Sequence, residues 1–467
     1  MARDHSGHPI LDTHRYRYRP GPGPLLRRLP PAGGDPVSHL LVLGAGVSGL
    51  AAARLARREG IPVTLYDGRF ESDALAAGFS VATGEWDPLL LEGVEVVVTS
   101  PGFSERSRPI VDTLEAGLPI WSEIEFAWRH LEAPVVAVTG TNGKTTVTET
   151  AAAMLQASGM EAPATGNIGT PLSDFTERRY DVLVVEVSSF QLRFIDTFHP
   201  VAAAITNVAL DHLDWHGSAY AYERAKERIF ENQTAGDLLV FDADDPGALK
   251  LSARAPSKLY PVSGRRRPDG GGGVDHGKLV IRDLMIDLAD LPSQDPADLV
   301  NIACAATLAL DLEATPEAVS QVATEFHPGA HRRSMVLESG GIAWVDDSKA
   351  TNPHAAMASI RAHPSVILIA GGLAKGLDVT DLATEPNVRM LIGIGEAGPE
   401  LVAAAGSRGL LAGTLERAVE MALQVAEEGD TVLLAPGCAS FDQFRSYEER
   451  GDRFAELVIE RLGGGRE

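Results

Sequence analysis

The sequence predicts an α/β protein built from three tandem α/β domains. From residue 38 onward, short apolar strands, glycine turns and amphipathic helices alternate, which is the pattern of parallel sheets with crossover helices. The chain has 467 residues, which is too many for a single hydrophobic core. Of these residues, 44% are hydrophobic and 22% are charged. No apolar run reaches the eighteen or so residues that span a bilayer. We therefore expect several globular domains and no membrane association.

Charge and cysteine content narrow the class of protein further. The formal net charge is −23, so the chain as a whole should repel nucleic acid. Its two cysteines, Cys304 and Cys438, form neither a disulfide framework nor a metal-binding pair, which fits a reducing cytoplasm. Residues 1–37 are rich in Pro, Gly and Arg and lack the apolar segment of a secretory signal. They predict a disordered basic extension.

The first predicted domain covers residues 38–130 and is Rossmann-like. Its turn "GAGVSG", residues 44–49, follows a strand and opens a helix, and Asp67 ends the next strand, as in a dinucleotide-binding fingerprint. The same small residues also suit a tight turn for helix packing, or a helix N-terminus that binds another diphosphate, such as that of a UDP-sugar. The motif alone leaves these three interpretations open.

The second predicted domain, residues 131–328, opens with a variant phosphate-binding loop in "VAVTGTNGKTTVTE". The common loop has a glycine where Val138 stands, and here the turn glycine is moved to Gly140. Gly140 and Gly143 would let backbone N–H groups face phosphate oxygens, Lys144 would supply a cation, and the Thr145 hydroxyl suits Mg²⁺. The strand before and the helix after this loop favour nucleotide binding over a chance glycine turn.

Further polar residues follow the strands of this second domain. Glu186 ends the strand "VLVVE" and would face the phosphates, a common place for a Mg²⁺ ligand. The loop "NVALDHLDWHGS", residues 207–218, is dense enough in Asp and His to suggest zinc, although a solvated loop is the alternative. Lys226 lies in "AYERAKERIF", whose spacing predicts a charged surface. The stretch "SGRRRPDGGGGVDHGKL", residues 263–279, predicts a mobile loop without a site.

A third strand and helix series predicts the last domain, residues 329–467. Its strands end in "VDDSKATNP", "LIAGGLAKG" and "LLAPGCASFDQF". Together with "GTNGKTTVTE", "GNIGTPL", "EVSSFQL" and "NVALDHLDWHGSAYAYERAKERIF", these segments resemble the Mur ligases, in the expected order over about residues 38 to 462. The loop "GTNGKT" is shared by the wider superfamily, including folylpolyglutamate synthases. "DSKATNP" and "CASFDQF" resemble the D-glutamate-adding branch.

The resemblance implies an ATP-dependent amide ligase of peptidoglycan precursor synthesis, and thus of cell wall biogenesis, cell shape and cell division. Its substrates would be UDP-N-acetylmuramoyl-L-alanine and D-glutamate, and the enzyme a cytoplasmic monomer. The γ-phosphoryl group would convert the terminal carboxylate into an acyl phosphate, which the amine of D-glutamate attacks. The alternatives are an L-glutamate-adding or folylpolyglutamate-type ligase, or a regulatory module that senses UDP-sugars or NAD without turnover.

The resemblance also assigns residues. It places ATP at Gly140, Thr141, Asn142, Gly143, Lys144, Thr145, Thr146, Val147, Asn301, Arg332 and Asp347. It places the UDP substrate at Val47, Ser48, Asp67, Arg69, Gly102 and Asn167, and the amino acid at Thr351, Lys375, Ser440, Phe441 and Tyr447. Two Mg²⁺ ions would be held by Thr145, Glu186, His212 and Lys226, the last as a carbamate.

The resemblance makes five of these residues catalytic: Lys144, Glu186, His212, Lys226 and Lys349. The chain departs from the family at two positions. Gly68 stands where a hydroxyl residue is frequent, and Asp298 where Asn is common, so the contacts to UDP and to the adenine edge are the least constrained. The choice between D- and L-glutamate, the extent of domain closure and the role of residues 1–37 are not determined by the sequence.

Overall fold

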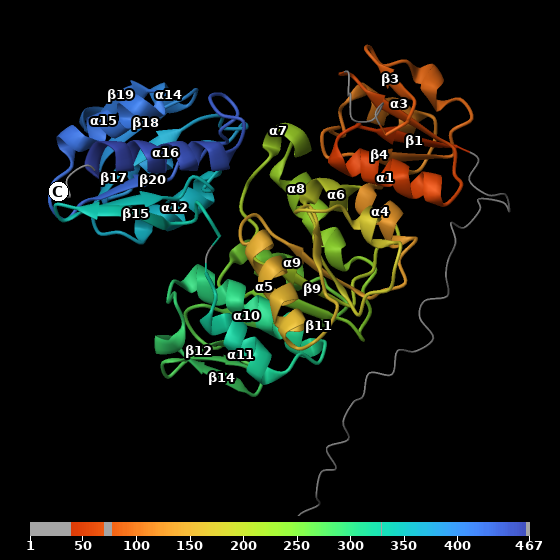
Figure 1. Cartoon of the computed structure of the whole chain (residues 1–467), viewed down its shortest axis with the longest axis horizontal. Coiled ribbons are helices and arrows are strands. Elements are labelled where there is room, and N and C mark those ends of the chain that lie inside the picture. Colours follow the sequence, from red (N-terminus) through yellow and green to blue (C-terminus); the bar gives the residue numbers. More distant parts are fainter. Residues whose placement is uncertain (1–38, 70–76, 328, 464–467) are drawn as a thin grey trace, which may run out of the picture.

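The computed structural model describes residues 39–69, 77–327 and 329–463. Three α/β domains follow one another along the chain, as predicted, and each has its own sheet (Figure 1). In the view of Figure 1 the first domain, red to orange, and the third domain, cyan to blue, lie on opposite sides of helix α7 of the central domain. The predicted basic extension, residues 1–37, falls outside the described residues.

The first domain has a five-stranded parallel sheet in the order β3-β2-β1-β4-β5. Its strands are β1 (Leu40–Leu43), β2 (Val63–Asp67), β3 (Val81–Thr83), β4 (Val96–Thr99) and β5 (Ile120–Ser122). Its helices are α1 (Val47–Arg58), the 3-10 helix η1 (Pro88–Leu91), α3 (Arg108–Glu115) and α4 (Glu123–Trp128). Strands β1 and β4 are completely buried apolar runs, the pattern of a parallel sheet covered on both faces.

The central domain has a nine-stranded sheet in the order β14-β13-β12-β11-β10-β9-β6-β8-β7. Its strands are β6 (Val135–Thr139), β7 (Ala164–Gly166), β8 (Leu183–Glu186), β9 (Ala202–Ile205), β10 (Leu238–Asp242), β11 (Lys258–Ser263), β12 (Gly272–Asp275), β13 (Lys278–Ile281) and β14 (Leu284–Asp287). Strands β13 and β14 are antiparallel additions to an otherwise parallel sheet.

The helices of the central domain cover both faces of this sheet. They are α5 (Lys144–Ala157), η2 (Leu172–Phe175), α6 (Ser189–Arg193), α7 (Leu213–His216), α8 (Ala219–Glu227), η3 (Arg228–Phe230), α9 (Pro246–Ser252), η4 (Leu288–Asp290), α10 (Pro296–Asp311) and α11 (Pro316–Thr324). Side chains of α5 and α10 form one core with strands β6, β8 and β9. That core holds the start of α5 rigidly at the carboxyl end of β6.

The expectation of a mobile loop over residues 263–279 is wrong. Strand β12 and the start of β13 lie within it and pair with each other. The glycines serve close packing: a Cβ at Gly271 would collide with the carbonyl oxygen of Pro261, and one at Gly273 with that of Arg266. Glycines that allow backbones to approach within a sheet look, in sequence, like glycines of a flexible loop.

The third domain has a six-stranded sheet in the order β15-β16-β20-β17-β18-β19, of which only the β15 and β16 pair is antiparallel. Its strands are β15 (Ser334–Ser339), β16 (Ile342–Asp346), β17 (Val366–Gly371), β18 (Val388–Ile394), β19 (Gly409–Gly413) and β20 (Thr431–Leu434). Its helices are α12 (Pro353–Arg361), α13 (Asp381–Thr384), α14 (Gly398–Ala405), η5 (Gly406–Arg408), α15 (Leu415–Val425) and α16 (Tyr447–Leu462).

The first two domains share a hydrophobic core, whereas the third domain has cores of its own. One cluster runs from the first sheet, with Leu40 and Val98, through Phe126 of α4 into the central sheet, with Val135 and Leu183. The two clusters of the third domain contain only residues of that domain. Among the helices in the described ranges, none combines the length and the hydropathy required to cross a membrane.

Candidate active site

The loop between β6 and α5 has the backbone geometry of a phosphate-binding loop. Gly140 has φ 154° and Gly143 has φ 82°, and Gly143 is the N-cap of α5. A Cβ at Gly140 would collide with Thr206 Oγ1, and one at Gly143 would lie 2.5 Å from Asn301 Oδ1. Only glycine fits both positions. Asn301, a predicted ATP residue, therefore lies against this loop, and the N-terminal end of α5 offers its positive dipole there.

Two lysines converge on the same loop. Lys144 Nζ donates to the carbonyl oxygens of Gly140 and Thr141, at 3.0 Å each. Lys226 Nζ donates to the Gly140 oxygen at 2.6 Å, and the residue is 1% exposed. Burial away from water lowers the pKa of Lys144, and it lowers the pKa of Lys226 well below the usual value. The surface position that spacing predicted for Lys226 is wrong.

Within the described part of the chain, Glu186 accepts hydrogen bonds through only one of its two carboxylate oxygens. It ends β8, is 2% exposed, and its Oε1 accepts a hydrogen bond from Asn167 Nδ2 at 2.9 Å. Its Oε2 is buried without a partner among the residues described. A buried, unpaired carboxylate oxygen is costly unless a ligand uses it, and a hard cation such as Mg²⁺ prefers that ligand. The residues present therefore fit a metal ion at this point.

A cavity of about 100 Å³ lies beside the two lysines and Asn167. It is lined by Gly140, Thr141, Lys144, Asn167, Ser188, Ser189, Phe190, Asp211, His212, Tyr222 and Lys226. It thus brings together predicted residues from the nucleotide, metal and UDP-substrate groups. Other predicted residues of the loop and of α5 are covered to different extents: Asn142 and Thr145 are half-buried, and Thr146 and the Val147 side chain are buried.

The Asp- and His-rich loop does not form the zinc site that its composition allowed. His212 begins α7 with φ 53°, and its ring meets that of Phe190 edge to face at 4.7 Å. Asp214 is exposed, whereas His216 is buried with Nε2 2.9 Å from Ser189 Oγ. Burial lowers the pKa of His212 and of His216 to about 4. No group of three or more His, Cys, Asp or Glu in the described part of the chain is placed to hold a metal ion.

A second group of predicted residues lies on the third domain. Lys349 Nζ donates to Tyr447 Oη at 2.7 Å, and burial lowers the pKa of Lys349 to about 8. Asp347 accepts the backbone N–H of Arg333 at 3.2 Å, and burial raises its pKa to about 6. Burial also lowers the pKa of Arg332. Electrostatic interactions with Tyr447, Asp347 and Glu186 raise it and so offset part of this effect. Charges of both domains therefore act on the same space.

The third domain meets the central domain through side chains next to this space. Lys375 Nζ donates to Asp211 Oδ1 at 2.7 Å. Asn352 Nδ2 donates to Asn142 Oδ1 at 3.0 Å, and Asn142 Nδ2 lies 3.1 Å from His354 Nδ1. Thr351 is half-buried beside Asn352. Ser440 is buried, and Phe441 is 70% exposed.

The predicted UDP-substrate residues of the first domain lie at its own glycine turn. Val47 is 69% exposed, Ser48 is half-buried, and Gly102 is exposed. The Asp67 carboxylate accepts the backbone N–H groups of Ala45 at 3.0 Å and of Arg69 at 3.1 Å. A Cβ at Gly49 would collide with the carbonyl oxygen of Gly44. Gly49 thus allows close packing of α1 against the turn, which is one of the three interpretations of this motif.

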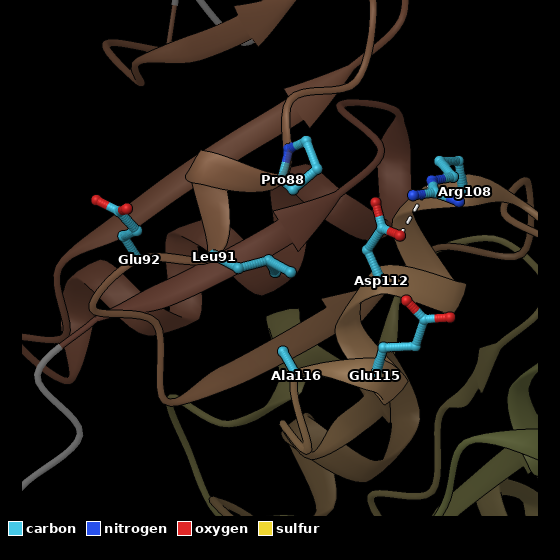
Figure 2. A pocket seen from close by; sticks show the side chains of 7 residues that line it. All are labelled: Pro88, Leu91, Glu92, Arg108, Asp112, Glu115 and Ala116. Atoms are coloured by element: carbon cyan, nitrogen blue, oxygen red, sulfur yellow. Dashed lines mark ion pairs between the residues drawn. The ribbon is translucent and has the colours of Figure 1, made fainter.

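A larger hollow lies elsewhere on the first domain (Figure 2). Its volume is about 400 Å³, and it is lined by Pro88, Leu91, Glu92, Arg108, Asp112, Glu115 and Ala116. Arg108 Nε and Asp112 Oδ1, one turn apart on helix α3, form an ion pair at 3.0 Å. None of the predicted site residues lines this hollow, so the smaller cavity at Gly140 remains the candidate active site.

Several residues of the site were missed by sequence reasoning. Asn207 Oδ1 accepts the backbone N–H of Asn142 at 2.8 Å, and Tyr222 Oη lies 2.9 Å from Thr141 Oγ1. Tyr222 stands one helical turn before Lys226 on α8, and its ring lies 4.8 Å from Lys226 Nζ. That four-residue spacing was a signal that could have identified Tyr222. Asn352, the N-cap of α12, carried no comparable signal.

Three family models match the chain in the order of its domains. They describe a MurD-like N-terminal domain of Mur ligases at residues 38–122, a Mur ligase middle domain at residues 138–265, and a Mur ligase glutamate ligase domain at residues 331–438. A UDP-N-acetylmuramoylalanine–D-glutamate ligase of Frankia casuarinae is 42% identical over 447 residues, 91% of this chain and 94% of that protein. The chain belongs to the Mur ligase family.

Other relatives and solved structures agree with this assignment. The ligase of the same name from Pelotomaculum thermopropionicum is 37% identical to this Mur ligase, covering 90% of this chain and 97% of that protein. The UDP-N-acetylmuramate-alanine ligase MurC of Thermotoga maritima has a TM-score of 0.55 at 18% identity, covering 91% of this chain and 100% of that one. A folylpolyglutamate synthase/dihydrofolate synthase of Yersinia pestis reaches 0.53 at 20% identity, covering 72% and 92%. These two likenesses show the fold alone.

Proposed function

We propose that this Mur ligase adds D-glutamate to UDP-N-acetylmuramoyl-L-alanine at the expense of ATP, in the synthesis of peptidoglycan precursors. The observation that carries the proposal is the 37 to 42% identity, over about 90% of the chain, to relatives named as ligases of D-glutamate to UDP-N-acetylmuramoylalanine. The geometry at Gly140 supports it, since two lysines and an unpaired carboxylate oxygen surround the loop that would hold the phosphates.

The nucleotide loop supplies the electrostatic part of the reaction. Lys144 now donates to two loop carbonyl oxygens, and the same ammonium would turn to the phosphates of ATP. Transfer of the γ-phosphoryl group to the substrate carboxylate makes an acyl phosphate, whose phosphate is a good leaving group when the amine attacks. Preorganised cations that face the transferring group commonly contribute several kcal/mol to such a step.

Glu186, Thr145, His212 and Lys226 would hold two Mg²⁺ ions. Bound there, Mg²⁺ would neutralise the negative charge of the phosphoryl group. The free Oε2 of Glu186 fits this role, and the lowered pKa of His212 keeps its imidazole neutral, as a metal ligand must be. The buried Lys226 would be carried as a carbamate: its pKa is well below the usual value, and only the neutral amine adds to carbon dioxide.

The third domain would bind the amino acid. Lys375 would pair with the side-chain carboxylate of D-glutamate, with Thr351, Ser440, Phe441 and Tyr447 around the substrate. Lys349 lies 2.7 Å from the Tyr447 hydroxyl and would approach the transferred phosphate. The first domain would hold the uridine diphosphate at Val47, Ser48, Asp67, Arg69 and Gly102. Asn167, which now bonds Glu186, would contact the muramoyl end.

Phosphate release from ATP tests the proposal. The protein is supplied with UDP-N-acetylmuramoyl-L-alanine and, one at a time, D-glutamate, L-glutamate and other D- and L-amino acids. We expect release that depends on both substrates and is fastest with D-glutamate. Release that needs L-glutamate, or a folate in place of the UDP substrate, would instead support the other superfamily ligases. Binding of UDP-sugars without any release would support the sensor.

We further propose that the enzyme acts in the cytoplasm as a monomer on small molecules and does not bind nucleic acid. The formal net charge of −23 supports the last point, because it repels a polyanion. Cys304 and Cys438 are both buried and unpaired, which suits a reducing compartment. Size-exclusion chromatography with light scattering would test the monomer.

A further inference from the structure

The contact between the central and third domains centres on the buried carboxylate of Asp211. Lys375 Nζ donates to its Oδ1 at 2.7 Å, and the two side chains are 11% and 7% exposed. The second oxygen, Oδ2, accepts from Asn352 Nδ2 at 3.4 Å. Two side chains of the third domain thus donate hydrogen bonds to one carboxylate of the central domain. Neither partner of the ion pair lies in the hydrophobic cluster that joins the first two domains.

The loop that carries Lys375 is held in an uncommon conformation. Lys375 has φ 55°, in the left-handed region that a residue other than glycine adopts only at a cost in free energy. A Cβ at the next residue, Gly376, would lie 3.9 Å from the backbone nitrogen of Asp214, in the first turn of α7. The loop therefore lies next to the start of α7, and the bond from Lys375 to Asp211 ties it to the segment that leads into this helix.

Lys375 is the cation that the proposed function gives to the substrate's side-chain carboxylate. In the structure that ammonium is already paired with a carboxylate of the protein. A buried lysine that loses its partner is strongly destabilised, so the substrate must replace Asp211 as the partner as the contact breaks. An amino acid whose side chain ends in an amide lacks the charge for this exchange.

We propose that Asp211 is a built-in competitor for the amino-acid site: it occupies Lys375 until the carboxylate of the incoming amino acid displaces it, and the displacement frees the Lys375 loop from α7. This inference rests on the proposed function, because it needs Lys375 to bind the substrate. It assigns to Asp211 a role in substrate selection. This role is separate from that of the neighbouring His212, which the proposed function makes a metal ligand.

Steady-state kinetics of Asp211→Asn is the first test. Asparagine keeps the shape of the side chain and an oxygen for the backbone N–H of His212, which now donates to Asp211 Oδ1 at 2.8 Å. We expect a KM for D-glutamate about tenfold lower, from removal of the competing charge, with the KM for ATP changed less than about twofold. A gain in affinity is a result that a damaged fold does not give. Asp214→Asn, which removes an exposed charge three residues after Asp211, in helix α7, is the matched control and should leave every KM near wild type.

Small-angle X-ray scattering of the substrate-free protein is the second test. Asp211→Asn and Lys375→Ala should both increase the radius of gyration, because each removes the ion pair between the domains, and Asp214→Asn should not. A KM for D-glutamate that is unchanged or higher in Asp211→Asn overturns the inference, and so does an unchanged scattering profile. Absence of turnover by the wild-type protein with every amino acid overturns the proposed function instead.

Discussion

Replacement of Lys144 by alanine should abolish ligation while leaving the UDP substrate bound. Lys144 Nζ makes two hydrogen bonds of 3.0 Å to loop carbonyl oxygens, and ATP would replace these acceptors with phosphate oxygens. A charge-assisted hydrogen bond contributes about 1.5 to 3 kcal/mol, so two contribute about 3 to 6 kcal/mol. At about 1.4 kcal/mol per factor of ten, kcat/KM for ATP should fall by roughly 10² to 10⁴.

The fold should tolerate this change. The Gly140 oxygen keeps its bond from Lys226 Nζ at 2.6 Å, so only the Thr141 oxygen loses a partner. Phosphate release measures the loss of turnover, and isothermal titration calorimetry measures binding of UDP-N-acetylmuramoyl-L-alanine, whose uridine would lie on the first domain. Wild-type turnover would refute the role of Lys144. A loss of UDP-substrate affinity greater than about tenfold, or 1.4 kcal/mol, would refute the assignment of the two sites to different domains.

Three further predictions concern the other sites. NAD should not bind the glycine turn at residues 44–49, because the proposed function gives that turn to the uridine diphosphate and the loop at Gly140 to the nucleotide that the reaction needs; quenching of tryptophan fluorescence by sub-millimolar NAD that UDP reverses would contradict this. Lys375→Ala should lower kcat/KM for D-glutamate about tenfold to a hundredfold, far more than for ATP, whereas equal losses for all substrates would indicate a role in domain closure. The kcat/KM for ATP should fall as pH rises through about 8, the pKa of Lys349 in the free protein, because only its ammonium form neutralises the phosphoryl group; Lys349→Arg should remove that inflection, and a wild-type kcat/KM that stays level across that pH would count against the role.

The sequence predicted those parts of the site that are local in the chain. Gly140, Gly143 and Lys144 were identifiable because a strand, a glycine turn and a helix must follow one another to build such a loop, and all three occupy it. The three-domain α/β fold followed from the same alternation of elements. Glu186 was placed correctly at a strand end because the carboxyl ends of parallel strands share one edge of the sheet.

The parts that failed depend on distant contacts. Lys226 looked like a surface residue because Glu223, Arg224 and Glu227 surround it in sequence, yet it is buried by the loop at Gly140, 86 residues away. The glycines of residues 263–279 looked mobile because the backbone oxygens that they pack against, those of Pro261 and Arg266, are brought close only by the folded chain. The pairing of Asp211 with Lys375 spans 164 residues and two domains, and nothing in either local pattern indicates it.

The hydrophobic cluster shared by the first two domains has a consequence for how the enzyme unfolds. Phe126 of α4 shares one core cluster with residues of both sheets, so neither sheet can lose its packing there without exposing the other. Among the described residues, the third domain shares no such cluster, and polar contacts attach it to the central domain. Heating should therefore melt the first two domains in one cooperative transition and the third in another. A destabilising mutation at Phe126 would thus impair UDP-substrate binding and ATP turnover together, while the third domain stays folded.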